Sequence, residues 1–121
     1  MASRWDVGDP DVDAFVDANV VSFAAWDLVI YLNSNPHVSE TVPSLCVVLG
    51  RQEHDLVPAL TRLVDNAVLL EDGIDPEAGV RYRLCDDGET RQVIARFVTL
   101  AGKREHRLEF VRRVLARLTG A

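Results

Sequence analysis

Residues 41–85 constrain the fold more strongly than any other stretch of this 121-residue chain. A mostly apolar segment runs from Thr41 to Gly50 and ends in glycine, the residue that most often closes a helix. A second segment, Gln52 to Asn66, repeats its leucines at helical spacing. Two short apolar strands then flank a loop rich in Gly, Asp and Pro. The stretch therefore predicts two helices joined by a tight turn, followed by a β-hairpin.

The two predicted helices, within residues 41–66, can be divided into inward and outward faces. Ser39 or Thr41 is expected to cap the first helix. Its expected inward residues are Leu45, Val48 and Leu49. In the second helix the expected inward residues are Leu56, Leu60, Leu63 and Val64, and the outward ones are Glu53, His54, Val57, Pro58, Thr61, Arg62 and Asp65.

Pro58 leaves the start of the second helix open. If the helix begins at Gln52, Pro58 removes a backbone hydrogen bond and should kink the helix. If Asp55 is the cap, Pro58 lies harmlessly in the first turn. The sequence is compatible with both starts.

The hairpin is expected to occupy residues 67–85, with strands at 67–71 and 80–84. On the second strand Arg81 and Arg83 alternate with apolar residues, a half-buried pattern that places both arginines in water. A short strand at 37–39 is expected to complete a small sheet. The fold class is therefore mainly α, with a small β-hairpin.

Residues 9–33 predict an N-terminal helical segment. Asp9 is expected to be its N-cap, with Pro10 at the first helical position. The apolar residues that follow lie on nearly every side, which indicates one helix, or two in succession, packed on more than one face. Asn19 and Ser22 mark a possible break between two helices.

Residues 87–119 predict a long, basic C-terminal helical segment, capped by Asp86 or Asp87. Gly102 leaves open whether it is one helix or two. Its apolar residues follow a three-then-four spacing, typical of a helix that packs along another helix. That stripe can pack on the chain's own first helix or build a two-fold homodimer. We predict the dimer, with an interface of Phe15, Trp26, Ile94, Phe97, Leu108, Val111, Leu115 and Leu118.

Charge is distributed unevenly along the chain, whose formal net charge is −6. Residues 1–80 hold three Arg and fourteen Asp or Glu, so their sum is 3 − 14 = −11. Residues 81–121 hold ten Lys or Arg and five acids, so their sum is 10 − 5 = +5. The C-terminal arginines are expected to keep that helix in solution or to pair with the acidic part of the same or a partner chain.

Length and composition predict one domain over residues 1–121, located in the cytoplasm. Residues 1–8 are expected to be a lead-in, and the N-terminus carries aspartates where a secretory signal carries Lys or Arg. No apolar run approaches the roughly 18 residues of a membrane span, so we expect no membrane partner.

No catalytic, metal or cofactor motif is indicated. The sequence contains neither a P-loop nor a GxGxxG pattern, and its histidines at 37, 54 and 106 are scattered. The aspartates at 9, 11 and 13 do not have the spacing of a calcium loop. Cys46 and Cys85 are expected to be buried reduced thiols, although the sequence leaves a disulfide open. We expect a protein that is not an enzyme and has no cofactor.

Residues 26–85 resemble the winged helix-turn-helix domains of MarR-like and PadR-like bacterial transcriptional regulators. The matching pieces are Leu45–Gly50, Leu60–Leu69 and Val80–Leu84, and flanking terminal helices also fit those families, which dimerise through them. Ala67 stands where such regulators usually have Gly. The resemblance implies a recognition helix in the major groove and a wing on the DNA backbone, with contacts from Gln52, His54, Thr61, Arg62, Arg81 and Arg83.

The charges oppose that implied function, because binding to phosphate needs cations. The predicted recognition helix carries Glu53 and Asp55, and the wing tip carries Asp72, Asp75 and Glu77. We therefore predict a regulatory protein that binds an unidentified protein partner, or only dimerises, with an interaction surface of Glu53, Asp72, Asp75 and Glu77. The alternative is a dimeric MarR-like regulator that binds duplex DNA.

Overall fold

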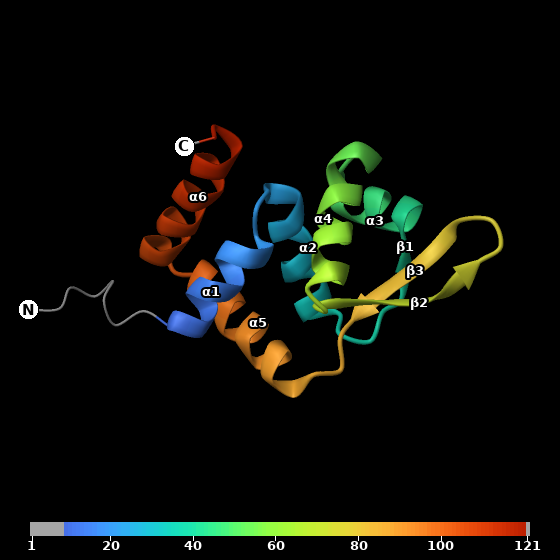
Figure 1. The fold of residues 1–121 in the computed structure, drawn as a ribbon, viewed down its shortest axis with the longest axis horizontal. Helices are drawn as coiled ribbons and strands as arrows, with labels where there is room; N and C mark the ends of the chain where they lie inside the picture. The colour runs from blue at the N-terminus through green and yellow to red at the C-terminus, as the bar shows by residue number, and fades with distance from the viewer. Residues whose placement is uncertain (1–8, 121) are drawn as a thin grey trace, which may run out of the picture.

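A computed structural model describes residues 9–120 of the chain, and the lead-in predicted at residues 1–8 lies outside them. Within this range the chain is mainly helical with one small antiparallel sheet, which confirms the predicted fold class at that level (Figure 1). No helix in residues 9–120 is both long and apolar enough to cross a membrane. The elements are α1 (Pro10–Asn19), α2 (Phe23–Ser34), β1 (Glu40–Thr41), α3 (Val42–Leu49), α4 (Glu53–Asp65), β2 (Leu69–Asp75), β3 (Gly79–Leu84), α5 (Gly88–Ala101) and α6 (Arg104–Leu118).

The N-terminal segment is two helices, which break between Asn19 and Ser22, and the second runs to Ser34, one residue beyond the predicted segment. The carboxylate of Asp9 accepts hydrogen bonds from the backbone N–H groups of Asp11 and Val12 and so caps α1. α1 ends at Asn19, and the hydroxyl of Ser22 accepts a hydrogen bond from a backbone N–H in the first turn of α2. Each cap satisfies N–H groups that the helix itself leaves without partners.

α3 starts and ends as predicted, but Val48 faces outward instead of inward. Thr41 is its N-cap, and Gly50 closes it in the left-handed conformation at φ 65°. Leu45 is buried and Leu49 packs against the core. The prediction that Val48 faces inward is wrong, because a helix of eight residues places only one narrow row against its neighbours, and Val48 is 49% exposed.

α4 begins directly after Gln52, so Pro58 lies inside the helix and Asp55 is not the cap. The predicted faces are confirmed: Leu56, Leu60 and Leu63 are buried, Val64 packs against the core, and the seven outward residues are exposed. The leucines of α4 are thus used in the core, and its outward face mixes polar residues with exposed Val57 and Pro58.

The sheet has the order β1–β3–β2, with both pairs antiparallel. The strand predicted at 37–39 is wrong in position: the N–H of Val38 closes a turn on the carbonyl of Asn35, which delays the strand to Glu40–Thr41. β2 runs on to Asp75 across an irregularity between Glu71 and Ile74, so the loop is shorter than predicted.

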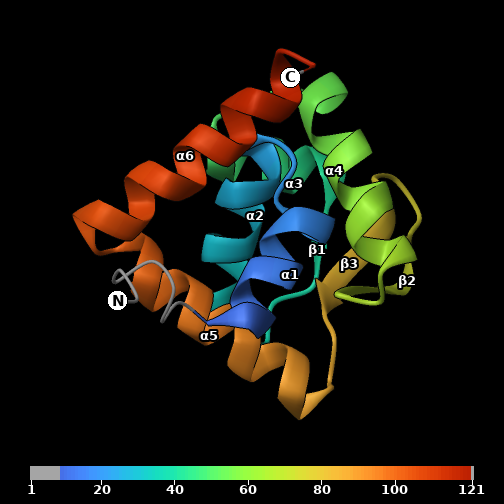
Figure 2. The same cartoon turned by 60° about the vertical axis from the view of Figure 1, so that its left-hand side comes forward.

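An aromatic cluster joins four helices. Trp26 of α2 lies with its ring centroid 5.5 Å from that of Phe97 in α5 and 6.2 Å from that of Phe110 in α6. The Phe97 and Phe110 centroids are 5.2 Å apart, and Phe15 of α1 lies 6.2 Å from Phe97. Figure 2 shows α1, α2, α5 and α6 converging on this region. The cluster makes the terminal helices part of one core.

This core corrects half of the predicted dimer interface. Phe15, Trp26, Ile94 and Phe97 are buried within the single chain and have almost no surface left for a second copy. The apolar spacing does reflect packing between helices. The C-terminal segment divides at Gly102 into α5 and α6, and their buried apolar residues pack within the single chain. Leu108, Val111, Leu115 and Leu118 remain at least partly exposed on α6.

Ion pairs fasten α1 to the C-terminal helices. Arg96 of α5 contacts Asp9 at 2.5 Å, and Arg113 of α6 contacts Asp13 at 3.1 Å. Arg117 donates to the backbone carbonyl of Asp17. The acidic start and the basic end of the chain therefore pair within one protomer, one of the arrangements that the charge distribution allows. At a partly exposed surface each pair contributes at most about 1 kcal/mol.

Ala67, which stands where MarR-like and PadR-like regulators usually have Gly, lies in the left-handed region at φ 59°. A residue with a Cβ is disfavoured there by about 1–2 kcal/mol, and glycine loses about 0.5–1 kcal/mol of unfolded-state entropy. We expect Ala67→Gly to raise the free energy of unfolding in urea by about 0.5–1 kcal/mol. The matched control is Ala95→Gly, on the exposed side of helix α5, in which the free energy of unfolding should fall by about 1 kcal/mol. Equal losses in both variants would contradict the strain at Ala67.

Phe110 tests whether α6 belongs to the core of the single chain. We expect Phe110→Ala to lower the free energy of unfolding by about 3–5 kcal/mol, because it leaves a cavity beside Trp26 and Phe97. The loss should be the same at low and high protein concentration, measured by denaturant unfolding. Leu118→Ala, on the exposed side of α6, is the control and should change little. A loss that shrinks on dilution would mean that Phe110 packs across a dimer.

Candidate interaction surfaces

The outward side of α3 and α4 combines exposed apolar residues with acids. Val47 is 83% exposed, Val48 49% and Val57 40%. α3 and α4 contact each other, next to the sheet (Figure 1). We name this surface the α3–α4 face and define it as Val47, Val48, Gln52, Glu53, His54, Val57, Pro58 and Thr61, all exposed.

The predicted DNA contacts of α4 lie on or beside this face but bring few free cations to it. Gln52, His54 and Thr61 are exposed, and His54 lies 3.5 Å from the carboxylate of Asp55. Arg62 points back toward α1 and donates to the carbonyl of Ala18 at 3.2 Å. The nearby Arg51 donates through Nε to Asp27 of α2 at 2.8 Å.

The two hairpin arginines are also held by the chain itself. Arg81 lies 3.0 Å from the carboxylate of Asp75 and donates to the carbonyl of Ser39. Arg83 makes two hydrogen bonds to Asp86, at 2.9 and 3.2 Å, and lies 3.4 Å from Asp72. Both are half-buried, so the prediction that they lie free in water is corrected. Asp72 and Asp75 lie on β2, next to β3, which carries both arginines, whereas Asp86 follows the end of β3.

These contacts shift the affinities of the groups for protons. Hydrogen bonds from the backbone N–H groups of Ala78 and Glu77, with Arg81 adding to them, lower the pKa of Asp75. The hydrogen bonds that Arg83 donates to the carboxylate of Asp86 lower the pKa of Asp86 and raise the pKa of Arg83. Charged hydrogen bonds therefore neutralise the hairpin from within.

The predicted protein-interaction residues divide into two kinds. Asp72 and Asp75 accept from arginines, so part of their charge is compensated. Glu53 and Glu77 are exposed, and no described residue forms an ion pair with either side chain. The exposed valines of α3 were missed, although the run from Leu45 to Leu49 holds more apolar residues than one helix face can bury.

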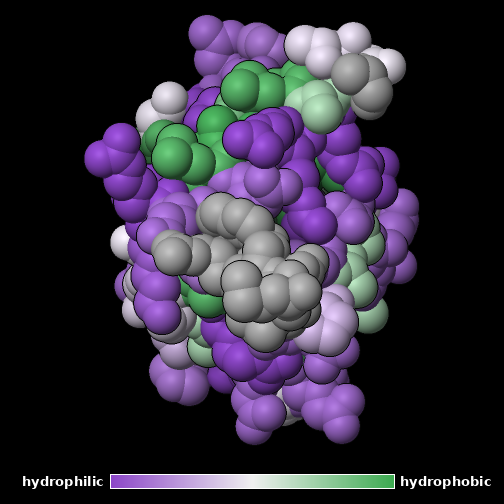
Figure 3. All heavy atoms as spheres, turned by 90° about the vertical axis from the view of Figure 1, so that its left-hand side faces the viewer, coloured by the Kyte–Doolittle hydropathy of each residue, from purple (hydrophilic) through white to green (hydrophobic). Residues whose placement is uncertain are grey.

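A second exposed apolar surface lies on α6. Leu108, Leu115 and Leu118 are 53%, 48% and 57% exposed, and Val111 between them is half-buried. We name these four residues the α6 stripe. Figure 3 shows hydrophobic residues gathered over this part of the molecule. Lys103, Arg104 and Arg107 are exposed at the start of α6, and no described residue pairs with them.

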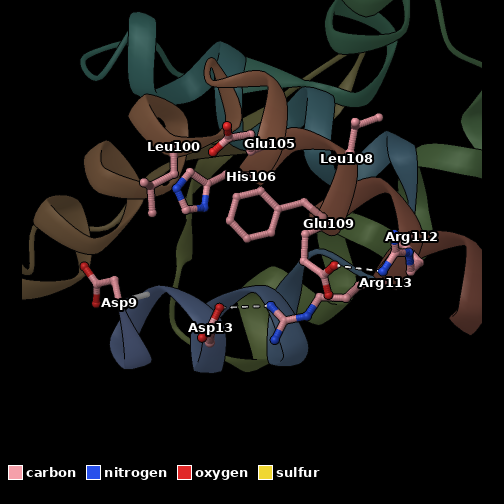
Figure 4. A pocket seen from close by; sticks show the side chains of 10 residues that line it. Asp9, Asp13, Leu100, Glu105, His106, Leu108, Glu109, Arg112 and Arg113 are labelled. Atoms are coloured by element: carbon pink, nitrogen blue, oxygen red, sulfur yellow. Dashed lines mark hydrogen bonds and ion pairs between the residues drawn. The ribbon is translucent and has the colours of Figure 1, made fainter. Parts of the chain in front are cut away.

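A cleft of about 570 Å³ lies between the start of α1, the end of α5 and α6 (Figure 4). Its apolar part is formed by Leu100, Leu108 and Phe110. Asp13 on its rim is already paired with Arg113, and Glu109 with Arg112 at 3.2 Å. The charges of Asp13 and Glu109 on the rim are therefore compensated within the chain.

Possible metal ligands and thiols lie within residues 9–120. No three His, Cys, Asp or Glu side chains within that range are grouped to hold a metal ion. Cys46 is half-buried and Cys85 buried, and both are free thiols, which settles the disulfide that the sequence left open.

Comparisons with known proteins add no assignment: no family model, no curated protein and no solved structure matches this chain. A functional proposal for this chain therefore rests on its exposed surfaces. They offer apolar and acidic groups on one side and apolar and basic groups on another.

The titration of Asp75 tests the internal neutralisation of the hairpin. A lowered pKa in the folded state means that this carboxylate stabilises the fold above pH 3.8, the ordinary value, and that the contribution is lost as pH falls through the folded pKa. We expect a carboxyl ¹³C NMR titration midpoint below 3.8. In Arg81→Gln the titration midpoint of Asp75 should rise only part of the way toward 3.8, since the backbone N–H donors of Glu77 and Ala78 remain. A wild-type midpoint at or above 3.8 would contradict these contacts.

Proposed function

We propose that this chain is a cytoplasmic winged-helix regulatory protein that works through protein–protein contacts and has no catalytic step. The order of α2, β1, α3, α4 and the β2–β3 hairpin supports the winged-helix part, because it is the order that the resemblance to MarR-like and PadR-like regulators implies. The protein-binding part is supported by the charges and apolar residues of the α3–α4 face.

The observation that carries the proposal is the internal pairing of the arginines. Arg51, Arg62, Arg81 and Arg83 are the basic residues between positions 42 and 83, and each one bonds to an acceptor of the same chain. Affinity for DNA comes largely from cations that replace counterions on the phosphates. An arginine committed to a carboxylate must give up that partner before it can bind phosphate.

The remaining charge is negative. Residues 42–83 contain four arginines and seven Asp or Glu, so their sum is 4 − 7 = −3. Unpaired Glu53 on α4 and Glu77 at the hairpin turn would meet phosphate with like charge. A protein partner, in contrast, gains from the same acids and from burying Val47, Val48 and Val57.

DNA binding is the alternative function, and one observation favours it. Gln52, His54 and Thr61 are exposed on the outward side of α4 and at its start, as a helix that enters a major groove requires. In this alternative Arg81 and Arg83 leave their carboxylate partners, and Arg62 leaves its backbone carbonyl partner, and all three bind DNA phosphates instead.

Self-association is also part of the proposal. Leu108, Val111, Leu115 and Leu118 are the members of the predicted dimer interface that retain exposed surface. Burying exposed leucines of this kind contributes about 25 cal/mol per Å² of apolar area removed from water. The predicted self-association is therefore retained in the proposal through the exposed apolar residues of α6.

Fluorescence anisotropy of generic duplex DNA, titrated with protein at about 50 and about 200 mM salt, tests the choice between protein and DNA. We expect no steeply salt-dependent binding by the wild-type protein, and no change in Arg81→Ala or Arg83→Ala. Binding that falls by orders of magnitude between the two salt concentrations, and weakens in both variants, would favour the DNA-binding alternative.

A release variant is the matched control for that titration. Asp72→Asn, Asp75→Asn and Asp86→Asn together free Arg81 and Arg83 from their carboxylates and remove three negative charges. If pairing is what prevents phosphate binding, this variant should bind DNA more tightly than the wild type at low salt. Identical binding by the two proteins would show that the pairing does not matter.

A further inference from the structure

Two exposed apolar surfaces of the described residues lie beside charges of opposite sign. The α3–α4 face holds Val47, Val48 and Val57 together with Glu53, and the α6 stripe holds three leucines and a valine near Lys103, Arg104 and Arg107. Surfaces of complementary potential attract each other and fix the register of a contact. The chain therefore contains both halves of a possible interface.

The α6 stripe has the character of a basic amphipathic helix. Residues 103–118 contain six Lys or Arg and two Glu, so their sum is 6 − 2 = +4. Arg113 and Arg117 are used in contacts with α1. Lys103, Arg104 and Arg107 are exposed, and no described residue forms an ion pair with any of them.

The stripe of one molecule cannot cover the α3–α4 face of the same molecule. α6 is anchored by Phe110 in the aromatic cluster and by Arg113 on α1. Figure 1 shows α6 and α3 on opposite sides of α2. Any contact between the two surfaces is therefore a contact between copies.

We propose that the α6 stripe of one copy docks on the α3–α4 face of a second copy, in a head-to-tail arrangement. This inference rests on the proposed function and names the partner of its protein-binding face. Leu108, Leu115 and Leu118 would cover the exposed valines, while Arg104 and Arg107 would approach the acidic surroundings of Glu53. α6, with 15 residues, is about 22 Å long and α4, with 13, about 20 Å, so the two helices match in length.

The symmetric alternative, α6 against α6, is disfavoured by charge. Two α6 helices in contact would each bring Lys103, Arg104 and Arg107, for which no described residue is an ion-pair partner, and like charges at an interface repel. A head-to-tail contact is heterologous, so it leaves one free surface at each end and does not close unless the rotation forms a ring. Because one helix face is a small interface, association should be weak and should rise with concentration.

Complementation between two variants tests this arrangement by sedimentation equilibrium at about 50 mM salt. Val47→Arg places a positive charge on the α3–α4 face and leaves the α6 stripe intact. Leu115→Glu disables the stripe and leaves the face intact. Both positions are exposed, so both variants should fold, as circular dichroism can check.

We expect the wild-type average mass to rise with concentration and to fall back as salt is added. Each variant alone should stay at the mass of one chain. Their equimolar mixture should reach the mass of two chains and no more, because only one intact stripe and one intact face remain. Ile74→Arg and Ala95→Glu change exposed residues outside both surfaces and should associate like the wild type.

Three results would overturn the head-to-tail contact. The first is a wild-type protein that stays at the mass of one chain at all concentrations. The second is self-association that survives Val47→Arg but not Leu115→Glu, which indicates α6 against α6. The third is a mixture that shows only the mass of one chain. None of these results by itself makes the protein a DNA binder, which the anisotropy titration decides separately.

Discussion

The edge-to-face packing of Trp26 against Phe97 and Phe110 is the contact on which the rest of the structure depends. It joins α2 to both C-terminal helices and so turns the flanking segments into one core with the α3–α4 pair and the sheet. Aromatic pairs of this kind add about 0.5–1.5 kcal/mol each beyond the area that they bury. The consequence is functional as well as structural: within residues 9–120, the large apolar side chains left exposed lie on α3, α4, the hairpin and α6.

Charge is organised by the same folding pattern. Acids of α1 meet arginines of α5 and α6, and acids of the hairpin meet arginines on the neighbouring strand. Each pair contributes little to stability at an exposed site. Together they decide what the surface can bind. The arginines of the hairpin and around α4 bond to acceptors of the same chain, whereas no described residue forms an ion pair with Lys103, Arg104 or Arg107 at the start of α6. The proposed protein-binding function follows from this distribution of paired and unpaired charges over the surface.

The sequence was sufficient for the fold wherever local chemistry sets the boundary, as with the caps at Asp9 and Thr41 and the closing glycine at Gly50. It was insufficient where tertiary contacts decide. Helical spacing showed that Phe97 packs against another helix but not that the helix belongs to the same chain. Alternation on β3 showed Arg81 beside apolar neighbours, but the carboxylate that holds it is known only once the strands are paired.

The most direct test of the account is a backbone amide NMR spectrum of the wild-type protein, recorded on dilution and then with generic duplex DNA at about 50 mM salt. If the α3–α4 face binds protein and not phosphate, dilution should shift amide signals of α3, α4 and α6, and DNA should leave the signals of α4 and the β2–β3 hairpin unchanged. Salt-sensitive shifts in α4 and the hairpin on addition of DNA, with none on dilution, would contradict the account.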